Sequence, residues 1–140
     1  MNDVERERIA TLVGEARRAL GQLRRNGAEG EEALLSSEVK LGNIKYQFIV
    51  AIESCIDICT HIIARSYGRA PESYAGCFDL LVEEKVIENG LARQMSDFAR
   101  FRNVLVHRYW EVNNRRVIEK LRNDVKYIED FLRKAAALAE

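Results

Sequence analysis

One short stretch, RFRNVLVHRYW at residues 100–110, brings Arg, Asn, His and Tyr together within eight residues. The stretch holds His107, one of only two histidines, together with Arg102 and Asn103. A histidine side chain can move a proton near neutral pH, and an arginine can stabilise the negative charge that develops on a phosphodiester. We therefore expect Arg102 and His107 to be the catalytic residues.

The spacing of these residues limits how they can act together. On a helix each residue turns by about 100°, so Arg102 and His107, five residues apart, diverge by about 140°. Asn103 and His107 are four residues apart and share a face. The pair can act on one bond if the helix ends near His107, or if a second copy of the chain faces this one. The alternative is a helix that ends in cations because its dipole favours them there.

The elements that position this stretch are expected to be helical. One proline and eight glycines leave few interruptions in 140 residues, and Leu, Ala, Glu and Arg favour helix. The spacing of apolar residues predicts an all-α fold, a single bundle over residues 1–140 with four main helices and one short helix. Gly68 is expected to end a helix, and Asn113 to begin one. The main helices are expected at about 4–25, from between 31 and 37 to 66, 91–106 and 115–139, and the short one at about 72–84.

Charge is balanced overall but uneven around the stretch. The chain has 22 basic and 22 acidic residues, so its net charge gives no indication of a nucleic-acid partner. Near the stretch, only Glu111 and Glu119 offset seven basic residues, which are Arg100, Arg102, Arg108, Arg115, Arg116, Lys120 and Arg122. This local excess could bind a phosphate backbone, or it could meet the acidic short helix or a partner protein.

Two carboxylates interrupt the apolar second helix. Glu53, Asp57 and His61 follow one another at four-residue spacing and therefore share a face. Carboxylates in an apolar helix are costly unless they are paired. Glu53 and Asp57 could hold the guanidinium of Arg102 by bidentate hydrogen bonds. They could equally form ordinary salt bridges at a solvated edge.

The cysteine spacing indicates whether the chain has a metal site, and the N-terminus indicates the cellular compartment. Cys55, Cys59 and Cys77 are expected to be small buried residues. Cys55, Cys59 and His61 lack the spacing of a zinc site, so we expect no metal and no cofactor. The N-terminus is too charged for a secretory signal, and no apolar run is expected to be long enough for a membrane span. The chain is therefore expected to be cytoplasmic, without a membrane partner.

The pattern Arg102-x4-His107-x-Tyr109 resembles the Arg-x4-His-x-Tyr motif of the HEPN superfamily, in particular its HepT-like toxins. The resemblance extends beyond the motif and covers most of residues 40–125 in the right order. The segments that carry it are 46–63, similar to the second helix of that family, 70–74 with 78–81, similar to its short connector, and 98–103, which leads into the motif.

The resemblance implies a metal-independent endoribonuclease whose cleft forms between the protomers of a symmetric homodimer. His107 would take the proton of an RNA 2′-hydroxyl, and the freed oxygen would attack phosphorus to give a 2′,3′-cyclic phosphate. Arg102 would stabilise the phosphoryl oxygens. His107 of the second copy would supply the acid for the leaving group. Asn103, directly after the motif arginine, would orient the histidine or bind phosphate.

The resemblance also implies a partner, the nucleotidyltransferase antitoxin of a type II or type VII-like toxin–antitoxin pair. In some members the antitoxin attaches AMP to the motif tyrosine, here Tyr109, which would place bulk and negative charge at the mouth of the cleft. The alternative for Tyr109 is packing in the core or in an interface. Two alternatives for the whole chain are a non-catalytic HEPN module that docks a nucleotidyltransferase or binds nucleotide, and an unrelated scaffolding bundle.

Overall fold

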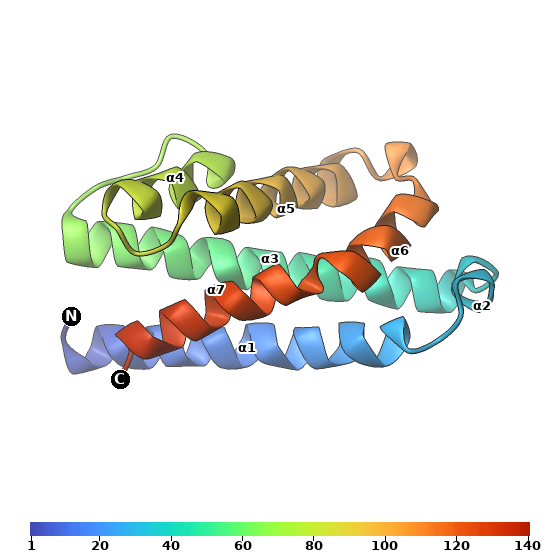
Figure 1. The fold of residues 1–140 in the computed structure, drawn as a ribbon, viewed down its shortest axis with the longest axis horizontal. Helices are drawn as coiled ribbons and strands as arrows, with labels where there is room; N and C mark the ends of the chain where they lie inside the picture. Colours follow the sequence, from blue (N-terminus) through green and yellow to red (C-terminus); the bar gives the residue numbers. More distant parts are fainter.

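Seven α-helices and one 3-10 helix make up the structure, a computed structural model that describes residues 1–140 (Figure 1). The helices are α1 (Asp3–Gly27), α2 (Glu31–Leu35), α3 (Glu38–Tyr67), α4 (Tyr74–Glu83), α5 (Asn89–His107), α6 (Asn114–Asn123) and α7 (Val125–Leu138), with η1 (Tyr109–Glu111) between α5 and α6. The all-α prediction is confirmed. The predicted count of four main helices and one short helix is wrong.

The helix that was expected to start between 31 and 37 begins as α3 at Glu38, and a separate short helix, α2, precedes it. The Ser37 hydroxyl caps α3 by accepting a hydrogen bond from the N–H of Lys40. The last predicted helix, 115–139, is divided at Asp124 into α6 and α7. Serine and aspartate compete with the helix for backbone hydrogen bonds, so they favour helix ends. Buried apolar residues continue across the break at Asp124, which is why spacing alone predicted one continuous helix there.

The helix ends on either side of the motif-bearing region follow ordinary capping chemistry. Gly68 ends α3 with φ 61° and ψ 30°, a left-handed conformation that favours glycine. The Asn113 side chain accepts hydrogen bonds from the N–H groups of Arg115 and Arg116. Both boundaries are confirmed. Because Asn113 fixes where α6 begins, it also limits the connection after α5 to a few residues.

The core lies around α3, which contacts α1, α4, α5 and α7 (Figure 1). Four phenylalanines, Phe48, Phe78, Phe98 and Phe131, are fully buried there. Their rings pair across helices, with centroids 6.0 Å apart for Phe48 and Phe98 and 5.4 Å apart for Phe78 and Phe131. Truncating such a side chain to alanine typically costs about 3–5 kcal/mol. The packing of α5 on α3 through Phe48 and Phe98 therefore fixes the helix that carries the motif.

The apolar character of α3 follows from this central position. By length and composition alone α3 could cross a membrane, contrary to the expectation from sequence, since its most apolar 18-residue window has a mean hydropathy of 1.5. In the structure 56% of that window is buried inside the bundle. A helix that is packed on more than one side is expected to be apolar around most of its circumference.

All three cysteines are buried, as expected. Burial raises the pKa of the Cys55 thiol well above its usual range. Cys59 of α3 and Cys77 of α4 form a disulfide, with their Cα atoms 6.3 Å apart. The prediction treated all three only as buried apolar residues, and in this it was wrong for two of them. The two cysteines lie 18 residues apart on different helices, so no helical spacing indicated the pairing.

Candidate active site

Arg102 is held against α3 by an ion pair. Its Nε and Nη2 groups donate hydrogen bonds to Oε1 of Glu53 at 3.0 and 2.8 Å. The Arg102 side chain is only 14% exposed, so water screens this pair less than it would a surface pair. Both donors meet one carboxylate oxygen, whereas the expected bidentate contact would use two. Glu53 therefore orients the guanidinium and leaves its own second oxygen free.

Two further side chains hold the same guanidinium. Nη1 of Arg102 donates to Oδ1 of Asn103 at 3.1 Å. The Tyr74 ring, at the start of α4, lies with its centroid 5.4 Å from the Arg102 guanidinium carbon, within the range of a cation–π interaction. An arginine has more N–H donors than these contacts use. The Arg102 guanidinium is thus fixed by α3, α4 and α5 and still has N–H groups available for a phosphate.

Tyr74 was not among the residues predicted for the site. It lies 28 positions before Arg102, and a cation–π contact has no fixed sequence spacing. The only indication in the sequence was an aromatic residue at the start of a short helix. The structure leaves it 49% exposed, beside the guanidinium that it contacts.

Asp57 is one helical turn from Glu53 but makes no hydrogen bond to Arg102. The expectation that both carboxylates hold the guanidinium is therefore not met in this structure. Asp57 lines a small pocket of about 110 Å³ together with Glu53, Tyr74 and Arg102. Partial burial raises the pKa of Asp57, Arg8 acts to lower it, and the negative charge of Glu53 raises it further.

His107 is the last residue of α5, and nothing in the chain holds its side chain. It is exposed and makes no hydrogen bond or ion pair. Because α5 continues through His107, the divergence of about 140° from Arg102 applies. Asn103, which shares the His107 face, is engaged with Arg102 instead. A single chain therefore has a fixed arginine and a free histidine, which no hydrogen bond connects.

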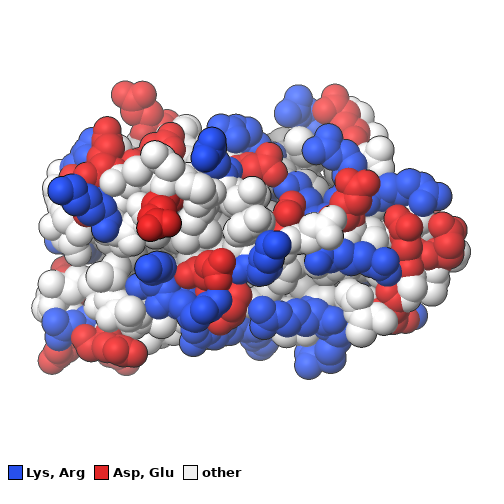
Figure 2. Space-filling view, viewed as in Figure 1, with Lys and Arg blue, Asp and Glu red and all other residues white.

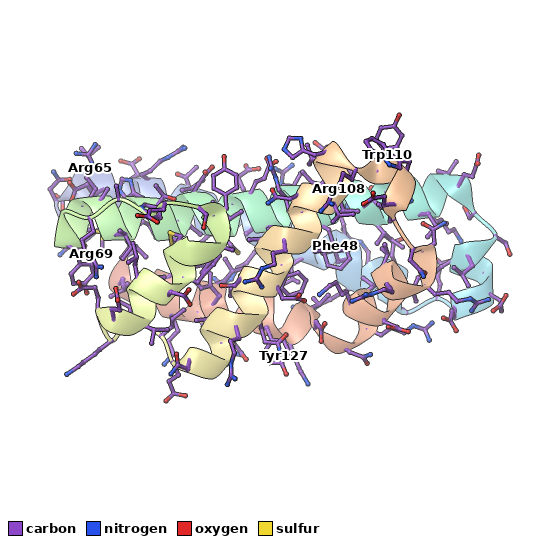
Figure 3. All side chains as sticks on the ribbon, turned by 90° about the horizontal axis from the view of Figure 1, so that it is seen from above. Phe48, Arg65, Arg69, Arg108, Trp110 and Tyr127 are labelled. Carbon is purple, nitrogen blue, oxygen red and sulfur yellow. A yellow bond between two sulfur atoms is a disulfide. The ribbon has the colours of Figure 1, made fainter.

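Aromatic side chains lie at the surface directly after His107. Tyr109 and Trp110 on η1 are 72% and 69% exposed, and their rings meet edge to face with centroids 5.3 Å apart. Figure 3 shows Trp110 and Arg108 at this end of α5. The alternative that Tyr109 packs in the core of its own chain is therefore excluded. Its phenol is open to solvent or to a partner.

The basic excess predicted around the motif is offset in part within the chain, since four of the seven basic residues pair with carboxylates. Figure 2 shows acidic and basic side chains interspersed over the face that it presents. Five of the seven basic residues have an acceptor, namely Arg102 with Glu53, Arg108 with Glu111, Arg115 with Glu31 and Glu32, Lys120 with Asp97 and Asp124, and Arg122 with the Glu29 carbonyl. Only Arg100 and Arg116 have no such partner.

Comparison with known proteins identifies relatives over nearly the whole chain. Residues 16–135 match the model of the family described as Ribonuclease HepT-like. The mRNA nuclease HepT of Shewanella oneidensis is 26% identical over 132 residues, which is 94% of this chain and 96% of that protein.

Solved structures share the same fold. A tri-AMPylated HEPN toxin of S. oneidensis, in complex with an MNT antitoxin, matches with a TM-score of 0.87 and 23% identity over 98% of this chain and 99% of that one. YutE, a cytosolic Bacillus subtilis protein of unknown function, matches with a TM-score of 0.83 and 21% identity over 99% and 92% of the two chains. Since the family model covers most of the sequence, this chain belongs to the Ribonuclease HepT-like family, and its fold is the one that these solved structures share.

Proposed function

We propose that this chain is the toxin of a two-component toxin–antitoxin pair and acts in the cytoplasm as a metal-independent endoribonuclease. The observation that carries the proposal is the pairing, on one helix, of an oriented arginine with free N–H donors and an exposed histidine without a partner. The mRNA nuclease activity named for the S. oneidensis relative supports the same chemistry, as does the family to which the chain belongs.

The reaction needs only proton transfer and charge stabilisation from the protein. His107 accepts the proton of the 2′-hydroxyl, and O2′ attacks the adjacent phosphorus. The bond from phosphorus to the 5′-oxygen breaks, which leaves a 2′,3′-cyclic phosphate, and the departing 5′-oxygen takes a proton to become a hydroxyl. Arg102 donates hydrogen bonds to the non-bridging oxygens as their negative charge increases.

We place this reaction in a cleft between two copies of the chain. The leaving group needs a second acid, and the other histidine of the same chain, His61, is half-buried on α3. A two-fold axis near the end of α5 would bring His107 of the second copy to the same phosphate. The exposed aromatic residues Tyr109 and Trp110, directly after α5, support an interface here, because aromatic side chains are enriched in the cores of interfaces.

We further propose that a nucleotidyltransferase antitoxin silences the toxin by modifying Tyr109. The Tyr109 oxygen would attack the α-phosphorus of ATP, pyrophosphate would leave, and the phenol would lose its proton. One or more adenylyl groups would then put negative charge beside Arg102 and His107 and repel RNA. The tri-AMPylated state of the S. oneidensis toxin and the 72% exposure of Tyr109 support this step. Intact-mass analysis with antitoxin and ATP should show adenylylation of wild type and its loss in Tyr109→Phe.

The ribonuclease proposal is tested by cleavage of RNA in EDTA. We expect wild type to cut and to leave cyclic-phosphate ends, and His107→Ala to be inactive. His61→Ala is the matched control, because it removes the only other histidine and should keep its activity. Equal cleavage by wild type and His107→Ala, or none by wild type, would contradict the proposal. A non-catalytic module that docks a nucleotidyltransferase or binds nucleotide would then be the better description.

A further inference from the structure

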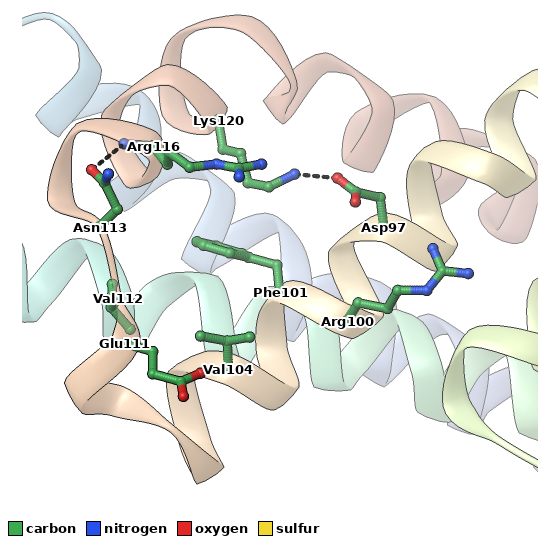
Figure 4. A pocket seen from close by; sticks show the side chains of 9 residues that line it. All are labelled: Asp97, Arg100, Phe101, Val104, Glu111, Val112, Asn113, Arg116 and Lys120. Carbon is green, nitrogen blue, oxygen red and sulfur yellow. Dashed lines mark hydrogen bonds and ion pairs between the residues drawn. The ribbon is translucent and has the colours of Figure 1, made fainter.

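A pocket of about 290 Å³ lies between α5, the connection that follows it, and α6 (Figure 4). Phe101 and Val104 of α5 form one wall, and Arg116 and Lys120 of α6 lie across from them. Asn113 stands at the start of α6. The volume is close to the lower limit for pockets that bind small molecules, so the pocket suits a ligand of about one nucleotide.

The charges in this pocket leave two arginines free. Lys120 is 10% exposed, and its Nζ donates to Asp97 at 2.5 Å. The Glu111 carboxylate lies 3.6 Å from Arg108. Each acidic group of the lining therefore already faces a cation. Arg100 and Arg116, which also line the pocket, make no ion pair and no side-chain hydrogen bond, so their guanidinium groups can bind an anion.

The apolar wall suits a flat ring. Phe101 is half-buried, and its ring is perpendicular to that of Phe48, with centroids 5.3 Å apart. The Nζ of Lys120 lies 5.3 Å from the Phe101 centroid, so a base would pack beside this ammonium group, against Val104 and the part of Phe101 that lines the pocket. RNA-binding proteins commonly stack unpaired bases on aromatic side chains and on guanidinium planes. Asn113 uses its Oδ1 to cap α6, while its side-chain amide donates to nothing in the protein. That amide can donate to the edge of a base.

The α5 residues Arg100 and Val104 of the pocket come about two turns and one turn before His107 along the helix. Seven residues make about two helical turns, so Arg100 shares a face with His107 and lies about 10 Å before it along the axis. Val104 is three residues before His107, and Arg102 points to the other side of the helix, toward Glu53. A strand whose scissile phosphate is at His107 would therefore place a neighbouring nucleotide beside the pocket.

We infer that this pocket is a subsite for one nucleotide of the RNA substrate, next to the phosphate that is cut. Its base packs on Phe101 and Val104, and its phosphate is bound by Arg116 and Arg100. The inference rests on the proposed ribonuclease function and extends it, since it assigns residues outside the motif to substrate binding.

Binding to a single-stranded RNA with 2′-O-methyl groups tests the subsite separately from cleavage, because that RNA cannot be cut. We expect Arg100→Ala/Arg116→Ala to bind about tenfold more weakly, as for the loss of a charge-assisted hydrogen bond. The slope of log affinity against log salt should fall by about 0.7, because the variant neutralises one phosphate fewer. Phe101→Leu should weaken binding about fivefold without changing that slope. Arg93→Ala is the control, an exposed arginine of α5 outside the pocket.

Cleavage kinetics provide the second measurement. On a longer RNA the double variant should raise KM, whereas on a dinucleotide, which is too short to fill the pocket, it should match wild type. If wild type cuts RNA but the double variant behaves like Arg93→Ala in binding and in KM, the subsite is wrong and the ribonuclease proposal stands. If wild type does not cut RNA, the ribonuclease proposal fails, and the binding measurement alone decides the subsite. Absence of wild-type binding would overturn it.

Discussion

Arg102 and His107 lie five residues apart on one helix, yet the chain holds them in opposite ways. The Arg102 guanidinium is fixed by Glu53, Asn103 and Tyr74 and is almost covered. The His107 side chain is exposed and has no partner at all. The Arg102 guanidinium is thus already oriented before substrate binds, whereas no contact within the chain orients the His107 imidazole.

This difference between Arg102 and His107 indicates that the group orienting His107 lies outside the chain. Electrostatic stabilisation works best when the donors are already oriented, because no energy is then spent on orienting them during the reaction. A proton-transferring group also needs a defined position, with its nitrogen or oxygen within about 3 Å of the atom whose proton it moves. Since nothing in this chain gives His107 that position, we expect the second copy and the RNA to supply it.

Mixing two inactive variants gives the largest effect that this comparison predicts. Arg102→Ala and His107→Ala should each lose more than about 100-fold in kcat/KM, the usual cost of removing a group that stabilises the transition state. If one cleft draws on both copies, a dimer of one variant with the other still holds one arginine and one histidine. Co-refolding the two variants should therefore recover part of the activity.

The control for this experiment is each variant refolded alone and assayed at the same total concentration. Size-exclusion chromatography of differently tagged chains shows whether mixed dimers form. Mixed dimers that remain as inactive as their parents would contradict a shared cleft that can work with one arginine and one histidine, each from a different copy.

Glu53→Gln tests whether the fixed orientation of Arg102 contributes to catalysis. Glutamine keeps an oxygen that can accept from Arg102 but loses the negative charge that makes these hydrogen bonds strong. We expect kcat to fall about tenfold with little change in KM, because the Arg102 contacts matter most in the transition state. Glu119→Gln, an exposed glutamate of α6 without an ion pair, should leave both constants unchanged. A Glu53→Gln enzyme with wild-type kcat would show that the charged contact between Glu53 and Arg102 does not serve catalysis.

Much of the fold could be predicted from the sequence because apolar residues at helical spacing mark the buried face of each helix. The first helix was expected at 4–25 and is observed at Asp3–Gly27, since Ile9, Leu12, Ala16 and Leu20 keep one continuous buried face. The break at Asp124 was missed for the same reason. Leu121, Val125 and Ile128 are all buried on either side of it, so the apolar pattern shows no interruption where the chain turns.

The site residues likewise fall into those that the sequence predicted and those that it did not. Arg102 and His107 were found through a local motif, and Glu53 through a charge in an otherwise apolar helix. Tyr74 and the free pair Arg100 and Arg116 were not distinguished. Their roles depend on which residues from other helices come near them, and pairing between distant helices leaves no periodic trace in the sequence.

The smallest predicted effect concerns Asp57, which lines the same small pocket as Glu53 and Arg102 but makes no hydrogen bond to Arg102. Its pKa is raised above the ordinary 3.8, chiefly by partial burial and also by Glu53. The folded state therefore holds this proton more tightly than the unfolded chain does. Below pH 3.8 the carboxyl is protonated in both states and costs nothing. As pH rises through the raised pKa, the folded state is left with an unfavourable charge, so stability falls.

Asp57→Asn removes this charge and should stabilise the protein at pH 7. Solvent screens a side chain that is so exposed, so we expect a gain of less than about 1 kcal/mol and a rise in Tm of at most about 4 °C. Near pH 3 the variant and the wild type should melt alike, because both side chains are then neutral. Asp79→Asn, on the exposed side of α4, is the control and should change little at either pH. A loss of stability in Asp57→Asn at pH 7 would instead mean that its carboxylate is held by a favourable contact, and that Arg8 outweighs both burial and Glu53.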